Sequence, residues 1–246
     1  MDNESKTVNE PLVILEESEE WDEYLASDEA FENELKKNIE DRPTYLESKP
    51  DFGKFKLPFN IFILMFICSL FRWENAIPYG LEASYNSVFV DGEYYRLFTS
   101  LFIHADLGHL FGNGWIFLVF AFLLYNYYGF LVFPTMSFLC GIATTAATIY
   151  FYPPNTRLLG ASGMIYSMVA MWLVFFLKFD TRYSFFIRLI RAIAFILVIL
   201  FPSEIKPHTS YSAHAFGFII GLIAALLLLP MVTKNIKAKE ELSHLP

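Results

Sequence analysis

Long apolar runs alternate with short polar segments along this sequence from about residue 54 onwards. A helix needs about 20 mostly apolar residues to cross the ~30 Å hydrocarbon layer of a bilayer. The pattern therefore predicts an all-α polytopic membrane protein with a six-helix bundle. The expected spans are Lys54–Trp73, Leu107–Tyr128, Phe130–Tyr152, Ala161–Phe179, Ser184–Pro202 and Tyr211–Met231.

These spans divide the chain into three predicted parts. Residues 1–50 form an acidic N-terminal segment, 51–233 the membrane domain, and 234–246 a short tail. Between the first two spans, residues 74–106 are rich in Tyr, Phe and turn residues. This stretch is too long for a simple hairpin, so we expect an ordered loop in the membrane interface.

The composition also indicates a membrane protein, because 55% of the residues are hydrophobic and 18% are aromatic. Residues 1–50 carry 16 Asp or Glu and 5 Lys or Arg, a net charge of −11, so the remainder must carry +3 to give the total of −8. The first residues are polar and acidic, which is atypical of a secretory signal peptide or a mitochondrial presequence. We expect a multi-pass protein of the plasma membrane, the bacterial inner membrane.

The Lys and Arg residues near the span ends predict the orientation, since cytosolic loops carry an excess of them. With both termini cytosolic, nine of these residues lie on the inner side and four on the outer side. This topology places the starts of the fourth and sixth spans on the outer side. The inner set is Lys54, Lys56, Lys178, Arg182, Arg188, Arg191, Lys234, Lys237 and Lys239, and the outer set is Arg72, Arg96, Arg157 and Lys206.

Four polar side chains lie where a membrane helix makes them costly, and such residues are functional candidates. His109 and Asn113 lie four residues apart on the second span and so share a helix face. Ser162 opens the fourth span, and His214 lies in the first turn of the sixth. The predicted topology brings all four near the outer ends of their helices, at one depth in the membrane.

Small residues accompany Ser162 and His214, and they allow close approach of two helix backbones in lipid. Gly160 and Gly163 flank the serine, while Gly217 and Gly221 follow the histidine on its own helix face. We therefore expect Ser162 and His214 to face each other, with the neutral ring removing the hydroxyl proton during nucleophilic attack. The predicted apolar spans contain no Asp or Glu to complete a triad, so a dyad is the simpler interpretation.

Other residues can support this chemistry. Tyr166 lies one turn after Ser162, where its ring could pack against His214. Asn113, His109 and the backbone N–H of Ser162 are candidate donors to the oxyanion of acyl transfer. Taken singly, Ser162 could instead cap a helix, His109 could be a packed histidine, and Asn113 could form a helix–helix hydrogen bond.

Three motifs on the second, fourth and sixth spans resemble those of the rhomboid family. They are the segment from His104 to Asn113 with the pattern H-x4-H-x3-N, residues 160–163 with the pattern G-x-S-G, and residues 213–221 with the pattern A-H-x2-G-x3-G. The resemblance covers about residues 54–232. It implies a rhomboid-like six-helix intramembrane serine protease in which Ser162 and His214 form the dyad and His109 and Asn113 serve the oxyanion.

The resemblance also implies transmembrane protein substrates in the lipid bilayer, cut near the outer end of the helix beside a small residue. No cofactor, metal or nucleic acid is expected. We expect His104 to tie down the first loop. Where many rhomboids have Trp-Arg in this loop, the chain has Tyr95-Arg96, an aromatic change that we interpret as affecting loop anchoring.

Two other function classes compete with a protease. A catalytically inactive rhomboid-like protein would bind membrane clients without cutting them, but it would lack the serine or the histidine. A transporter with a proton or substrate relay would have repeats or broken helices near the bilayer midplane. We find neither in the sequence. Cys68 and Cys140 are expected to be buried core residues, and His208 and His244 have no expected role.

Overall fold

The computed structural model describes residues 49–74, 80–200 and 210–243. Residues 1–48, with most of the predicted N-terminal segment, lie outside the described residues, as do His208 and His244. The elements in chain order are η2 (Phe52–Phe55), α2 (Lys56–Trp73), η3 (Asn86–Val90), α3 (Arg96–Thr99), η4 (Ser100–Phe102), α4 (Leu107–Tyr128), η5 (Leu131–Met136), α5 (Ser137–Phe151), α6 (Ser162–Phe179), α7 (Phe185–Leu200) and α8 (Tyr211–Ser243).

The described part of the chain is all-helical, as the sequence predicts. Its only bridge of β type is an isolated one between Ala83 and Leu158. Five helical segments are long and apolar enough to cross a membrane, namely Phe52–Trp73, Leu107–Tyr128, Leu131–Phe151, Ser162–Phe179 and Tyr211–Lys239. The chain is therefore a multi-pass membrane protein.

The sixth predicted span stays a prediction. Its helix, α7, has 16 described residues, which at 1.5 Å per residue cover about 24 Å, less than a ~30 Å hydrocarbon layer. The predicted span runs to Pro202, and residues 201–209 are outside the described ranges. Helix α8 is longer than the predicted span, since it continues to Ser243 and does not end near Met231.

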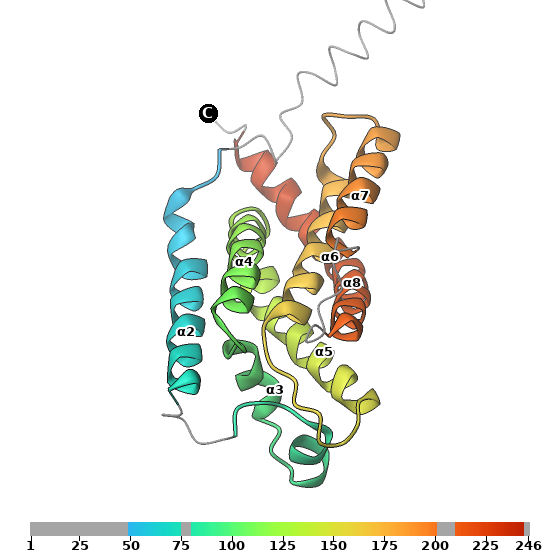
Figure 1. Cartoon of the computed structure of the whole chain (residues 1–246). Coiled ribbons are helices and arrows are strands. Elements are labelled where there is room, and N and C mark those ends of the chain that lie inside the picture. The colour runs from blue at the N-terminus through green and yellow to red at the C-terminus, as the bar shows by residue number, and fades with distance from the viewer. Residues whose placement is uncertain (1–48, 75–79, 201–209, 244–246) are drawn as a thin grey trace, which may run out of the picture. The chain divides into compact units, whose positions relative to one another are not determined.

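Helix α6 is the centre of the bundle (Figure 1). It packs against α4, α5, α7 and α8, and its contact with α8 is the most extensive in the described residues. Within its span 56% of the residues are buried, against 22% in the span that contains α2. A residue at the start of α6 is therefore surrounded by protein on several sides.

The loop between α2 and α4 is folded from residue 80 onwards, which confirms an ordered segment there. It lies at the end of the bundle where α6 begins (Figure 1). The guanidinium group of Arg72 on α2 donates to the buried carboxylate of Glu82 at 3.0 Å, and Arg96 donates to the carbonyl oxygen of Glu82 at 3.2 Å. Tyr95 is 53% exposed and donates its hydroxyl to Glu93 at 3.3 Å. Arg96, more than Tyr95, anchors the loop.

Candidate active site

Ser162 is the first residue of α6, and its hydroxyl does not cap the helix. The capping position is Ala161, which makes no side-chain cap bond. Gly160 precedes it with φ +106°, a conformation that favours glycine, and donates its N–H to the carbonyl oxygen of Ser100 at 2.8 Å. The simple explanation of Ser162 as a helix cap is therefore wrong.

The glycines of α8 meet the backbone of α6 directly. A Cβ on Gly217 would collide with the carbonyl oxygen of Gly163, and one on Gly221 would collide with that of Ser167. A Cβ on Gly163 would itself lie 3.4 Å from the carbonyl oxygen of Ala213. Since Gly163 follows Ser162 and Ala213 precedes His214, the two helices come together at the positions beside the predicted dyad. The predicted contact through the glycines is confirmed.

The ring of His214 is held by aromatic contacts. It stacks on Tyr166 with ring centroids 4.1 Å apart and an angle of 11° between the planes. Tyr211 approaches the same ring edge-on, at 6.0 Å between centroids. The predicted packing of Tyr166 against His214 is therefore confirmed, and this stacking couples the histidine on α8 to the helix that carries Ser162.

His109 and Asn113 point towards the turn before Ser162. A Cβ on Gly160 would lie 3.0 Å from Cε1 of His109 and 3.8 Å from Nδ2 of Asn113. Asp106 caps α4 by accepting the backbone N–H of His109 at 2.8 Å, which fixes the register of this helix. The Nδ2 atom of Asn113 is buried and has no hydrogen-bond partner in the described residues.

His104 is fully buried and links three segments of the site region. Its backbone N–H donates to Ser69 Oγ at 3.1 Å, and its carbonyl oxygen accepts from the indole of Trp73 at 2.9 Å. Through these bonds the backbone of His104 ties the end of the loop to α2. Its Nε2 also accepts the N–H of Ala161 at 3.4 Å, a link to the residue before Ser162 that the sequence did not predict.

The tautomer of His104 follows from these partners. A ring nitrogen that accepts must be unprotonated, so the proton lies on Nδ1 and is donated to Ser69 Oγ at 3.3 Å. Burial, with a smaller contribution from His109, lowers the pKa of His104 to about 3. The ring therefore stays neutral at physiological pH and keeps both contacts.

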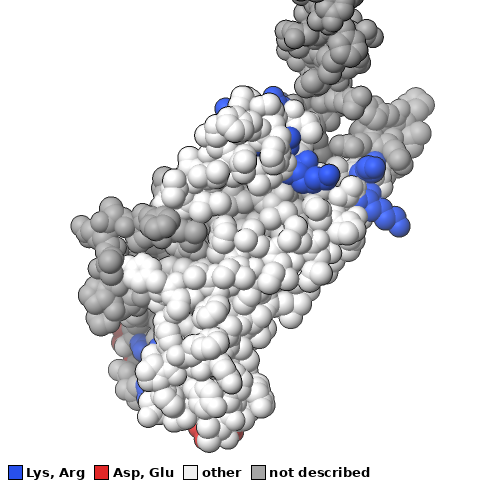
Figure 2. All heavy atoms as spheres, turned by 90° about the vertical axis from the view of Figure 1, so that its right-hand side faces the viewer, with Lys and Arg blue, Asp and Glu red and all other residues white. Residues whose placement is uncertain are grey.

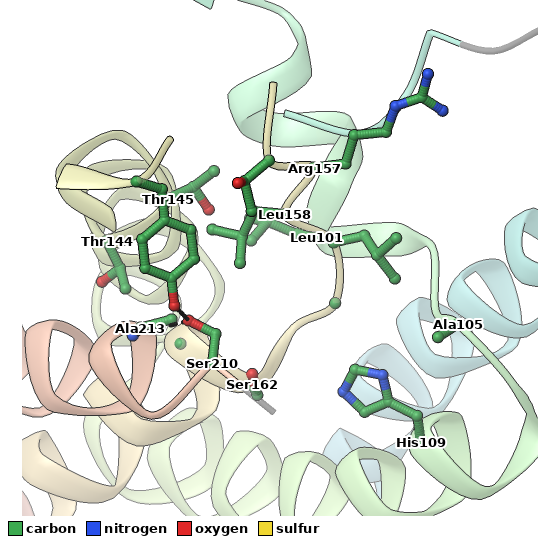
Figure 3. Close-up of a pocket in the computed structure, with 15 residues that line it drawn as sticks. Leu101, Ala105, His109, Thr144, Thr145, Arg157, Leu158, Ser162, Ser210 and Ala213 are labelled. Atoms are coloured by element: carbon green, nitrogen blue, oxygen red, sulfur yellow. Dashed lines mark hydrogen bonds between the residues drawn. The ribbon is translucent and has the colours of Figure 1, made fainter. Parts of the chain in front are cut away.

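A pocket of about 410 Å³ opens over Ser162 (Figure 3). The hydroxyl of Ser162 lies at its floor, with the ring of His109 to one side and Ser210 to the other. His214 is not among the lining residues, and no Asp or Glu lines the described wall. The lining residues are Leu101, Ala105, His109, Thr144, Thr145, Tyr152, Thr156, Arg157, Leu158, Leu159, Gly160, Ser162, Gly163, Ser210 and Ala213.

Several polar residues of this wall were missed in the sequence. Thr144 and Thr145 on α5, Tyr152 at its end and Ser210 before α8 all face the pocket. Serine and threonine are common where membrane helices pack together, and tyrosine is common at the membrane–water interface, so none of them stands out by residue type alone. Within the described ranges, no group of three His, Cys, Asp or Glu side chains is arranged to hold a metal ion. Cys140 is buried as expected, whereas Cys68 is half-buried.

A comparison with known protein families finds a match. The family model described as "Rhomboid domain" matches residues 91–231, which is more than half of the chain and includes the four polar residues singled out above. No curated protein matches the sequence at a significant level. The family match confirms the resemblance seen in the three motifs.

Proposed function

Because the chain belongs to the rhomboid family, whose members are intramembrane serine proteases acting on transmembrane substrates, we propose that it is an active endopeptidase with Ser162 as nucleophile and His214 as base. The contact of Gly217 with Gly163 carries this proposal. It brings together the two backbones next to the serine and the histidine. The pocket over Ser162 gives a substrate access to the hydroxyl.

In the proposed reaction, His214 takes the proton of Ser162 as Oγ attacks the carbonyl carbon of the substrate. The protonated histidine then gives the proton to the leaving amine, and water releases the acyl group by the reverse sequence. The stacked ring of Tyr166 limits rotation of the imidazole without adding a charge. A dyad is consistent with the ring contacts of His214 in the described residues, which are made by the aromatic side chains of Tyr166 and Tyr211.

The oxyanion of the tetrahedral intermediate needs hydrogen-bond donors that are already in place. The buried Nδ2 atom of Asn113, which has no hydrogen-bond partner in the described residues, is such a donor, and His109 lies beside the same turn. The N–H of Ser162 at the start of α6 adds the positive end of the helix dipole. These three groups are the proposed oxyanion site.

The proposed substrate is a membrane protein helix that is cut near its outer end. Ser162 lies at the start of a membrane-spanning helix, and the interfacial loop lies at the same end of the bundle (Figure 1). A small residue beside the cut is proposed from the resemblance to the rhomboid family, and the pocket of about 410 Å³ over Ser162 has room for it. The substrate helix must unwind locally there to expose its carbonyl group.

The proposed topology has both termini in the cytosol of a bacterium and the site on the outer side of the inner membrane. Figure 2 shows Lys and Arg side chains gathered at the end of the molecule where α6 and α8 end. An excess of cations on one side of a membrane protein is typical of the cytosolic side. The division into residues 1–50, 51–233 and 234–246 is proposed with it.

Reconstitution with a single-span model substrate tests this function. The wild-type protein in liposomes should produce two fragments, whereas Ser162→Ala should bind the substrate and leave it intact. A wild-type protein that binds but never cuts substrates of several sequences would instead be an inactive rhomboid-like binder. Comparing membrane proteomes of cells with wild-type and Ser162→Ala protein would then identify the natural substrates.

A further inference from the structure

Three hydroxyl groups meet where the end of α5 reaches the start of α8. The hydroxyl of Tyr152 lies 2.6 Å from Ser210 Oγ and 2.6 Å from Ser212 Oγ. The two serine oxygens are themselves 3.4 Å apart. Contacts of 2.6 Å are at the short end for hydrogen bonds between hydroxyls, so both serines are held firmly. Figure 3 shows the bond to Ser210 on the wall of the pocket.

Ser210 is the residue from which α8 starts. Its Oγ accepts the backbone N–H of Ala213 at 3.2 Å, the arrangement of a helix N-cap. Its carbonyl oxygen accepts the backbone N–H of His214 at 3.2 Å. The position of Ser210 therefore sets where the first turn of α8 begins and, through that turn, where His214 lies.

Helix α5 can hold Ser210 accurately because it is itself fixed against α6. A Cβ on Gly163 would lie 2.7 Å from Cγ2 of Thr144, so α5 packs tightly beside the residue that follows Ser162. Tyr152 directly follows the end of the same helix, eight residues after Thr144 and about 12 Å further along its axis. One rigid element thus contacts the serine helix at Thr144 and the start of the histidine helix at Tyr152. A stacked pair, Phe151 with Phe216 at 5.6 Å between centroids, adds to the second contact.

We propose that Tyr152 is a positioning residue for the catalytic base, a role that rests on the proposed function of His214. Its hydroxyl holds Ser210 and Ser212, and these fix the first turn of α8. Proton transfer needs heavy atoms within about 2.6–3.2 Å, and a displacement near 1 Å can cost roughly 10²-fold in rate. Loss of the hydroxyl should therefore lower turnover by displacing the first turn of α8, and with it His214.

The test compares Tyr152→Phe with wild type in a cleavage assay in liposomes. The expected result is a kcat lower by about ten- to hundredfold, a KM within about twofold of wild type, and equally slower labelling of Ser162 by a fluorophosphonate. Tyr150→Phe is the matched control, because this tyrosine lies two residues away, is 61% exposed and should keep wild-type kinetics. Ser210→Thr keeps a capping hydroxyl and should retain activity, whereas Ser210→Ala should resemble Tyr152→Phe.

A double-mutant cycle separates positioning from direct contact with the substrate. If the hydroxyl acts through the serines, Tyr152→Phe should cause no further loss in a Ser210→Ala/Ser212→Ala background. An independent loss there, a raised KM with normal kcat, or unchanged kinetics of Tyr152→Phe would overturn the inference. If Tyr152→Phe does not fold, Ser212→Ala removes one of the two bonds and should give a smaller loss of the same kind. A wild-type protein that neither cleaves nor reacts with the probe would overturn the proposed function itself.

Discussion

The proposed role of Asn113 as a hydrogen-bond donor to the oxyanion can be tested with a single substitution. Its buried Nδ2 has no partner in the described residues and lies beside the turn that leads to Ser162. Asn113→Ala should lower kcat by roughly 10²–10³-fold if the side-chain amide donates to the oxyanion. The loss should be smaller if the backbone N–H of Ser162 provides most of the stabilisation of the oxyanion. Cleavage kinetics and a thermal unfolding curve measure the two effects separately. A folded variant with an unchanged rate would remove Asn113 from the site.

His104 gives a prediction about pH. Its pKa in the folded protein is about 3, below the value near 6.5 of a histidine in an unfolded chain. Between about pH 3 and about pH 6.5 the unfolded chain therefore binds more protons at this histidine than the folded protein does. The contribution of neutral His104 to the free energy of unfolding is complete above about pH 6.5 and is lost as the pH falls. Unfolding midpoints of wild type in detergent should drop from pH 7.5 to pH 5 more steeply than those of His104→Gln. Equal slopes in the two proteins would contradict this.

Single residues differ in how far the sequence could predict them. The stacking of Tyr166 on His214 was predicted, because Tyr166 lies one turn after Ser162 and the helix that carries His214 was expected to pack beside that face. The bond from Ala161 to His104 and the cluster around Tyr152 were not. Both depend on the path of connecting turns, such as the one through Gly160 at φ +106°, and a periodic pattern contains no information about that path.

At the scale of helices, the contact between α6 and α8 depends on Gly217. In lipid there is little hydrophobic gain from joining two helices, so close packing through small residues stabilises the contact. A side chain on Gly217 would meet the carbonyl oxygen of Gly163, next to Ser162. Gly217→Leu should therefore abolish cleavage and labelling by a fluorophosphonate, although every proposed catalytic residue is still present.

The matched control for this change is Ile219→Phe. Ile219 is 54% exposed on another face of the same helix, so a larger side chain there meets no helix backbone. This variant should keep most of the activity. Near-normal activity of a stably folded Gly217→Leu protein would show that the base does not depend on the glycine contact.

Helix positions were predicted closely, but helix ends were not always. The bounds of Leu107–Tyr128 agree with the prediction, because Asp106 caps the start of this helix and Gly129, with φ +84°, ends it. Helix α8 extends to Ser243, twelve residues past the predicted end at Met231. Hydropathy reports where a chain leaves the hydrocarbon layer, whereas Lys, Glu, Ala and Leu after Met231 favour continued helix in water. The short structured turns of the interfacial loop have no periodicity that could predict them.

For the molecule as a whole, the acidic segment is predicted to be dispensable for catalysis. In the proposed topology it lies across the membrane from Ser162. A protein starting at Lys49 would keep the bond in which the N–H of Asp51 donates to Asn126 at 3.0 Å. It should fold in detergent and cleave the model substrate with a kcat close to that of the full chain. A truncated protein that folds but cannot cleave would show that residues 1–48 take part in catalysis or access.

The family and the fold could be read from the sequence because the motifs and the apolar runs agree with each other. The pocket over Ser162 could not, since its wall combines the loop before α4, the end of α5 and the start of α8. Residues that far apart in the sequence are brought together only by the packing of the bundle. The count of six spans depends on α7, whose predicted end lies beyond the described residues.

Site mapping with a fluorophosphonate tests whether Ser162 is the nucleophile and His214 its base. The purified full chain is reacted with the probe in detergent and digested, and the modified peptide is sequenced by mass spectrometry. One modified residue, Ser162, is expected in the wild-type protein. Labelling should be slower by several orders of magnitude in His214→Ala, and the Ser162→Ala/His214→Ala protein should be hardly worse in cleavage than either single variant. Modification of another serine, or labelling of Ser162 at an unchanged rate in His214→Ala, would contradict the proposed dyad.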